Sequence, residues 1–194
     1  MTDAVLVAWA ADPVIFAVLF LWGFGEAVAL PVVPDVLLGL LALATPAALG
    51  APLAAAVMGG VIGALALAEL GRRRRPLVDR ILAAQPGLGT RGMAAARRRI
   101  LDAGAVRGFA QLGPGLPLKA YVVSLVDREP NVAAGRLIGL ALLNRVTRIV
   151  PVVAAFAVVG HVARSAGASP SAALPAYLAG WTVFYLGYWW SRRA

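Results

Sequence analysis

The chain has 194 residues, of which 61% are hydrophobic and 14% are charged, and its net charge is +9. A soluble domain is nearer half apolar and about a quarter charged, so this composition and the mean hydropathy of +0.82 favour an integral membrane protein. The absence of cysteine excludes disulfides, thiol nucleophiles and cysteine-based metal sites. We expect one integral membrane domain over residues 1–194, too short for two transporter halves, and the sequence leaves open whether a homodimer supplies the second half.

Most of the positive charge lies in one polar segment, residues 72–107, which holds ten arginines against two aspartates. In a soluble protein such a charge would suggest nucleic acid. A single basic block between hydrophobic segments instead follows the positive-inside rule, so we expect this segment to be cytoplasmic and expect no nucleic-acid partner. Apolar residues recur in it at helical spacing, which predicts an amphipathic helix at the surface of the membrane.

Four segments are apolar and long enough to predict membrane-spanning helices. A break or a capped helix start is expected in the first of them, at Asp12-Pro13. Glycines in the second have the small-xxx-small spacing that allows close helix approach. Tryptophans and tyrosines in the last are typical of an interface belt. The four segments are residues 5–22, 53–70, 132–160 and 174–190.

The segment at residues 22–45 is apolar, yet it contains Glu26, Asp35, Pro31 and Pro34. A charge at the bilayer centre costs from about 3 to more than 10 kcal/mol, so these carboxylates need partners or a watery cavity. Each proline removes a backbone donor and breaks a continuous helix. Non-helical backbone at membrane depth is tolerated where it lines a cavity. We therefore predict a first re-entrant hairpin here.

The segment at residues 106–127 has the same pattern with a cation in place of the anions. Pro114 and Pro117 interrupt it, Lys119 follows, and Gln111 is a polar residue that could support the hairpin. We predict a second re-entrant hairpin that enters from the opposite side of the membrane. Two such hairpins suggest the inverted repeat of secondary transporters, with a site between them near the midplane.

The third predicted spanning helix carries Asn144, Arg145 and Arg148 far from its start. The spacing of Arg145 and Arg148 places both on one face, with Asn144 beside them. The fold class expected is therefore all-α and polytopic, with about four spanning helices and two opposed re-entrant hairpins.

The order of these motifs resembles the DedA family, also called the VTT or SNARE-associated domain, and its YqaA-type branch most of all. Residues 20–161 carry the resemblance, and four positions depart from the branch pattern: Gly115 for a proline, Asn144 for a glycine, and Ser124-Leu125 for Ala-Gly. The relatives with an Arg-Phe-x-Pro-x-x-Arg element would have arginine where Gln111 and Pro117 stand. The matching motifs are Phe24-Gly25-Glu26, Pro31-Val32-Val33-Pro34-Asp35, Gly71-Arg72, Pro117-Leu118-Lys119 and Asn144-Arg145-Val146-Thr147-Arg148.

The resemblance implies two opposed re-entrant hairpins and movement of lipid across the bilayer. Activities described for the family include recycling of undecaprenyl phosphate and scrambling of phospholipids, with proton coupling proposed for bacterial members. On this basis we expect a flippase- or scramblase-like protein of the bacterial inner membrane. With residues 72–107 inside, four spans and two re-entrant hairpins would leave both termini in the cytoplasm, and Arg192 and Arg193 would anchor the C-terminal tail there.

The charged residues have two interpretations each. Glu26 and Asp35 are candidate proton-exchanging carboxylates, since burial and nearby cations shift carboxylate protonation in opposite directions. Alternatively, Asp35 is only the N-cap of the following half-helix and Glu26 is structural. Lys119, Arg145 and Arg148 are candidates for binding a lipid phosphate. Alternatively, they only neutralise the carboxylates.

Enzyme activity is not expected, because the sequence suggests neither a catalytic triad nor a glycine-rich phosphate loop. The single histidine, His161, predicts no metal site, and no cofactor is expected. Two alternatives to lipid transport stay open: a membrane scaffold that recruits lipid or a partner through residues 72–107, and a small-solute exporter involved in envelope homeostasis.

Overall fold

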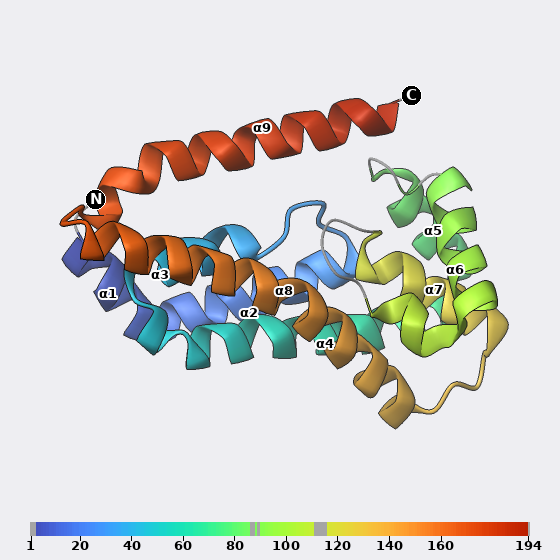
Figure 1. The fold of residues 1–194 in the computed structure, drawn as a ribbon. Helices are drawn as coiled ribbons and strands as arrows, with labels where there is room; N and C mark the ends of the chain where they lie inside the picture. The colour runs from blue at the N-terminus through green and yellow to red at the C-terminus, as the bar shows by residue number, and fades with distance from the viewer. Residues whose placement is uncertain (1–2, 86–87, 89, 111–115, 194) are drawn as a thin grey trace.

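The computed structural model describes residues 3–85, 88, 90–110 and 116–193, and every regular element in this part of the chain is helical (Figure 1). The elements are α1 (Asp3–Ala11), α2 (Pro13–Val28), α3 (Asp35–Ala44), the 3-10 helix η1 (Pro46–Ala48), α4 (Gly50–Arg73), α5 (Arg75–Ala83), α6 (Thr90–Phe109), α7 (Leu118–Arg128), α8 (Ala134–Ser165), the 3-10 helix η2 (Pro170–Ala173) and α9 (Leu174–Arg193).

Two described helices, α4 and α8, are long and apolar enough to cross a membrane. At 1.5 Å per residue they extend about 36 Å and about 48 Å, against a hydrocarbon core of about 30 Å. A third crossing results if α1 and α2, which are bent by 70° at Asp12, are counted as one span. Helix α9 is not among these helices, and its tyrosines, tryptophans and terminal arginines make it less apolar than α4. The fold is therefore that of a helical protein suited to a membrane, and the fourth crossing stays a prediction.

The bend between α1 and α2 has a local cause in the sequence. The Asp12 carboxylate accepts a hydrogen bond of 2.8 Å from the Val14 backbone N–H, and Pro13 occupies the first position of α2. Such a cap satisfies a donor at the helix start, and proline fits there because no helical hydrogen bond is lost. The break predicted at Asp12-Pro13 is confirmed.

Glycines bring α2 and α4 into close contact. A Cβ atom added at Gly59 would lie 2.8 Å from the Phe20 carbonyl carbon, and one at Gly63 would lie 2.8 Å from the Ala27 Cβ. Real Cβ atoms do not approach that closely, so the spacing of the two helices depends on glycine. The predicted close approach of this helix is confirmed.

The segment around Pro31 and Pro34 turns the chain back between α2 and α3. The two arms separate: α2 packs along α4, whereas α3 packs along α8 (Figure 1). The Trp22 indole N–H donates a hydrogen bond of 2.9 Å to the Val32 carbonyl and fixes the non-helical connection at residues 29–34. We call residues 29–34 the first tip.

The second interrupted segment lies between α6 and α7. Helix α6 ends at Phe109, and α7 begins at Leu118 with Pro117 as its N-cap. Pro114 and Gln111 lie outside the described residues. We call the described part of this connection that precedes α7, residues 116–117, the second tip.

The basic segment forms α5 and α6, which pack beside α7 at the end of the molecule opposite α1 (Figure 1). Val78, Leu82 and Ile100 are buried in a core shared with α7 and α4. Much of the apolar side predicted to face lipid is therefore covered by the protein itself. The exposed side is rich in arginine, at Arg73, Arg74, Arg80, Arg98, Arg99 and Arg107.

Helix α8 continues to Ser165, five residues beyond the predicted end. The Arg164 guanidinium donates hydrogen bonds of 2.6 Å and 3.3 Å to the carbonyls of Leu43 and Ala44 at the end of α3. A cation there satisfies the last carbonyls of α3 and opposes the negative end of its dipole. This long-range contact helps explain why the helix continues past residue 160.

Candidate functional site

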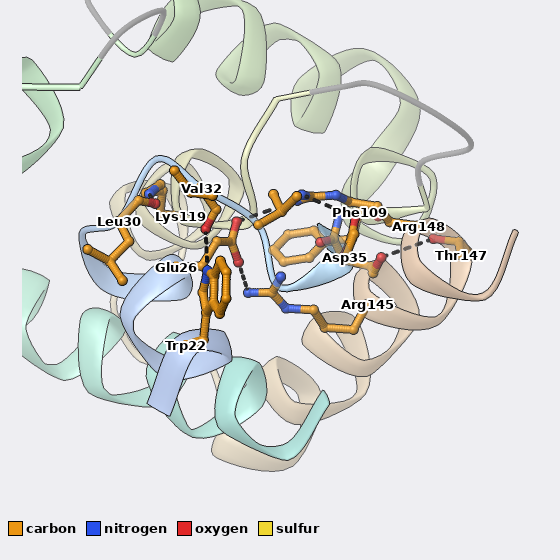
Figure 2. Close-up of polar contacts among 12 residues, drawn as sticks. Trp22, Glu26, Leu30, Val32, Asp35, Phe109, Lys119, Arg145, Thr147 and Arg148 are labelled. Atoms are coloured by element: carbon orange, nitrogen blue, oxygen red, sulfur yellow. Dashed lines mark hydrogen bonds and ion pairs between the residues drawn. The ribbon is translucent and has the colours of Figure 1, made fainter. Parts of the chain in front are cut away.

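Five charged side chains from four helices lie close together where the two tips meet (Figure 2). All of them were singled out in the sequence, and four are at most 3% exposed. They are Glu26 on α2, Asp35 on α3, Lys119 on α7, and Arg145 and Arg148 on α8.

The innermost contact is the ion pair between Arg145 Nη2 and Glu26 Oε2. Arg145 is fully buried and Glu26 is 2% exposed. A Cβ atom at Gly60 on α4 would lie 2.8 Å from Arg145 Cζ, so the glycine leaves the space that the guanidinium occupies. The small residues of α4 therefore make room for the Arg145 guanidinium as well as for the close packing of α2.

Arg148 lies one turn further along α8 and bridges the two carboxylates. Its Nη1 is 3.5 Å from Glu26 Oε1, and its Nη2 is 3.8 Å from Asp35 Oδ2. Both separations are long for charge-assisted hydrogen bonds, which are usually 2.7–2.9 Å. The Arg148 side chain is 14% exposed, whereas Arg145 is fully covered. Arg148 is therefore the more accessible and more loosely held arginine.

Lys119 joins the two interrupted segments directly. Its ammonium group donates a hydrogen bond of 2.7 Å to the Leu30 carbonyl in the first tip. Pro117 immediately precedes α7 and places Lys119 in its first turn. The predicted convergence of a cation from the second segment on the first is thus present, although the hydrogen bond is with a main-chain carbonyl and not with a carboxylate.

Asp35 is not the N-cap of α3. The capping position is Pro34, no side-chain hydrogen bond caps this helix, and Asp35 lies in its first turn. The capping interpretation of Asp35 is therefore wrong. The Pro34 carbonyl accepts hydrogen bonds from the Leu37 and Leu38 N–H groups, and the Asp35 carboxylate points toward Arg148.

Several buried polar atoms at this site have no hydrogen-bond partner within the described part of the chain. An unsatisfied buried polar group costs about 1–3 kcal/mol, so each needs an explanation such as a water, an ion or a ligand. Three cations also face only two anions in the cluster, which leaves one positive charge in excess. The unpartnered atoms are Asp35 Oδ1, Asn144 Oδ1, Arg145 Nε and Nη1, and Gln85 Nε2.

A cavity of about 430 Å³ opens beside this cluster. Its polar wall contains Glu26, Asp35, Lys119 and Arg148, and Arg145 lies behind it. Its apolar wall consists mainly of aromatic residues of α9, with Phe156 from α8. A cavity with an apolar wall and a few convergent charged groups is the usual form of a ligand site.

Asn144 on α8 connects the cluster to the second segment, since its side-chain amide donates a hydrogen bond of 2.9 Å to the Phe109 carbonyl at the end of α6. Gln85, Tyr177 and Tyr185 also line the cavity, although we did not expect them at the site from the sequence. The i, i+4 and i+8 spacing of Tyr177, Trp181 and Tyr185 was a usable signal of one aromatic helix face. Nothing in the local sequence pointed to Gln85.

Comparison of the chain with protein-family models, with curated proteins and with solved structures found no match in any of the three. Fold and site define a helical protein whose described residues include two or three helices able to cross a membrane and a charge cluster beside an aromatic cavity. Among the described residues, no group of three or more histidine, aspartate or glutamate side chains is placed to hold a metal ion.

Proposed function

We propose that this protein moves an anionic lipid across the membrane, as its resemblance to the DedA family implies. The observation that carries the proposal is the excess of three cations over two carboxylates in the cluster where two interrupted segments meet beside the cavity. Undecaprenyl phosphate and phospholipids both carry the phosphate that such a site would bind.

Lys119 and Arg148 are the proposed phosphate ligands, because both line the cavity. Arginine offers a two-pronged donor to phosphate, and lysine a compact charge. The long contacts of Arg148 with Glu26 and Asp35 make it the easier arginine for a phosphate to recruit. Arg145 stays with Glu26 and keeps the cluster in place.

Asp35 is the better candidate of the two carboxylates for proton exchange. Glu26 has two arginine partners, whereas Asp35 has one at 3.8 Å and an oxygen without a hydrogen-bond partner in the described part of the chain. A proton on that oxygen would weaken the attraction to Arg148 and free the arginine for a lipid phosphate. This order of events would couple proton binding to headgroup binding.

We further propose that residues 22–45 and 106–127 are opposed re-entrant hairpins, with both tips near the midplane. The hydrogen bond from Lys119 to Leu30 supports this arrangement. The arginine-rich face of α5 and α6 would lie on the cytoplasmic side of a bacterial inner membrane, with both chain termini on that side. A homodimer is compatible with this arrangement.

Reconstitution into liposomes tests the function. The purified chain should move a fluorescent phospholipid or a polyprenyl phosphate, and Lys119→Ala or Arg148→Ala should slow that movement at least tenfold. Arg98→Ala, which changes an exposed arginine away from the cavity, is the matched control. The proposal fails if the wild type moves neither lipid, or if both cavity variants move them at the wild-type rate.

The exposed arginines of α5 and α6 favour the scaffold as the alternative function. Such a scaffold would depend on the basic surface and not on the cavity. It predicts that Arg98→Ala together with Arg99→Ala abolishes function in cells, while Lys119→Ala and Arg148→Ala retain it. If the protein transports lipid, Lys119→Ala and Arg148→Ala abolish function in cells, and the variant with Arg98→Ala and Arg99→Ala retains it.

A further inference from the structure

We infer that the aromatic face of α9 binds the hydrocarbon part of the ligand, so that the cavity holds an amphiphile with its polar end on Lys119 and Arg148 and its apolar segment along α9. This inference rests on the proposed function in one respect, the negative charge of the ligand's polar end.

Five aromatic residues lie on one face of α9 and all of them line the cavity. Their spacing of 0, 4, 7, 8 and 11 residues repeats with the helical period. The opposite face of α9 is also apolar, with Val183 at 70% and Leu186 at 60% exposure. The five residues are Tyr177, Trp181, Phe184, Tyr185 and Tyr188.

An interface belt does not explain this face. From Tyr177 to Tyr188 a helix rises about 16 Å, whereas each interfacial layer of a bilayer is only about 5–8 Å thick. The rings also contact one another in sequence, from the pair of Tyr177 and Trp181 at 6.4 Å to the pair of Phe184 and Tyr188 at 6.4 Å between centroids. A continuous aromatic wall of this length suits an extended chain better than a headgroup.

The hydroxyl groups of two tyrosines hold α9 over the first tip. The Tyr185 hydroxyl accepts a hydrogen bond of 2.9 Å from the Val33 N–H, and the Tyr177 hydroxyl donates one to the Val36 carbonyl. These contacts place the aromatic wall opposite Asp35 and Arg148, so the polar and apolar walls belong to one cavity. In Figure 1, α9 lies apart from the other long helices for most of its length.

The charges of the polar wall fix the orientation of the occupant. A hydrocarbon segment placed against Lys119 and Arg148 would leave buried cations without water, which is costly. If the same segment lies along α9, the hydrocarbon of the ligand and the aromatic face of the helix both lose contact with water, which is favourable. The ligand class is therefore a chain-bearing phosphate ester, and free phosphate should bind much more weakly.

Two glycines of α9 provide a matched test. Gly180 lines the cavity, and a Cβ atom there meets nothing within 4 Å, so Gly180→Leu fills the subsite without a backbone clash. Gly187 is equally free of neighbours but does not line the cavity, so Gly187→Leu is the control. Native mass spectrometry of the full chain in neutral micelles would compare decyl phosphate, hexyl phosphate, inorganic phosphate and decyltrimethylammonium.

We expect decyl phosphate to bind the wild type at least tenfold more tightly than hexyl phosphate, because each buried methylene contributes up to about fourfold. Gly180→Leu should reduce this ratio to near one, and Gly187→Leu should leave it unchanged. Phe184→Ala, which removes an aromatic ring that is 44% exposed, should also reduce the ratio and provides a second variant if Gly180→Leu does not fold.

The two proposals fail in different ways. If Gly180→Leu and Phe184→Ala keep the wild-type ratio, the α9 subsite is wrong, whatever the headgroup preference. If the ratio depends on α9 but decyltrimethylammonium binds as well as decyl phosphate, the subsite holds and the anionic ligand of the proposed function is wrong.

Discussion

Lys119 donates a hydrogen bond of 2.7 Å to the Leu30 carbonyl and so joins two segments that are 89 residues apart. Lys119 is 1% exposed and is the one lysine in the sequence. The acceptor is a main-chain atom of the first tip, where the chain has left the helical hydrogen-bond pattern. The contact therefore has two effects. It provides a donor for a carbonyl that lies outside the hydrogen-bond pattern of α2 and α3, and it places a cation beside the cavity.

Replacing Lys119 by methionine should loosen the contact between the two tips. The variant keeps the apolar stem but removes the donor, and hydrogen bonds to charged groups contribute about 1.5–3 kcal/mol. We expect a lower thermal midpoint in detergent and faster hydrogen exchange in residues 29–34, with α4 unchanged. Equal exchange in the tip of variant and wild type would show that the hydrogen bond does not hold the two segments together.

Replacing Glu26 by glutamine should destabilise the protein strongly. Arg145 is fully buried and would lose its ion-pair partner, and an uncompensated buried charge costs about 3–5 kcal/mol. Replacing both members of the pair by methionine should recover much of this loss, since no buried charge is left without a partner. Thermal unfolding of the single and double variants measures the difference.

The control for that prediction is Glu69→Gln. Glu69 pairs with Arg72 and Arg73 at the end of α4, where its side chain is 46% exposed, so we expect little change. If the double methionine variant were no more stable than Glu26→Gln, the ion pair would be needed for the fold itself and not only for its charge balance.

The sequence predicted much of this site because its signals were local. Charges and prolines inside apolar segments are costly, so Glu26, Asp35, Lys119, Arg145 and Arg148 each needed a partner. The structure places all five in one cluster. What they do there stays a proposal.

Other features depend on contacts between distant elements, which local patterns do not specify. The buried side of α5 and α6 faces α7 and not lipid because residues far along the chain provide a core for Val78 and Ile100. The aromatic residues of α9 are typical of an interface belt, and the sequence does not show that Tyr185 contacts the first tip at Val33. Helix α8 is longer than predicted, and Arg164 contacts the end of α3.

Enlarging the glycines between α2 and α4 should separate these helices. A Cβ atom at Gly59 would lie 3.0 Å from the Phe20 Cα, and the backbone cannot yield as a flexible side chain does. Overpacking of this kind costs about 1–3 kcal/mol, so Gly59→Ala should lower the thermal midpoint. Gly71→Ala on the same helix meets nothing within 4 Å and should be neutral or stabilising. Equal midpoints for the two variants would contradict the close approach.

Asp127 should control the junction of the basic segment with α7. Its carboxylate accepts hydrogen bonds from Arg75 Nη2 at 3.1 Å and from Arg97 Nη2 at 3.0 Å, so it holds α5 and α6 to the end of α7. Asp127→Asn should weaken both contacts by about 1.5–3 kcal/mol in total and increase hydrogen exchange in α5. The side chain is 20% exposed, so high salt should weaken the wild-type contact and reduce the difference between the two proteins.

Asp79→Asn is the matched control for the Asp127 junction. Asp79 also accepts a hydrogen bond from Arg75, at 2.9 Å, but both residues belong to α5 and the Asp79 side chain is 56% exposed. This substitution leaves the contacts among α5, α6 and α7 in place, so exchange in α6 and α7 should match the wild type. If both substitutions raised exchange equally, the stability of α5 alone would explain the effect, and Asp127 would not be the residue that joins the three helices.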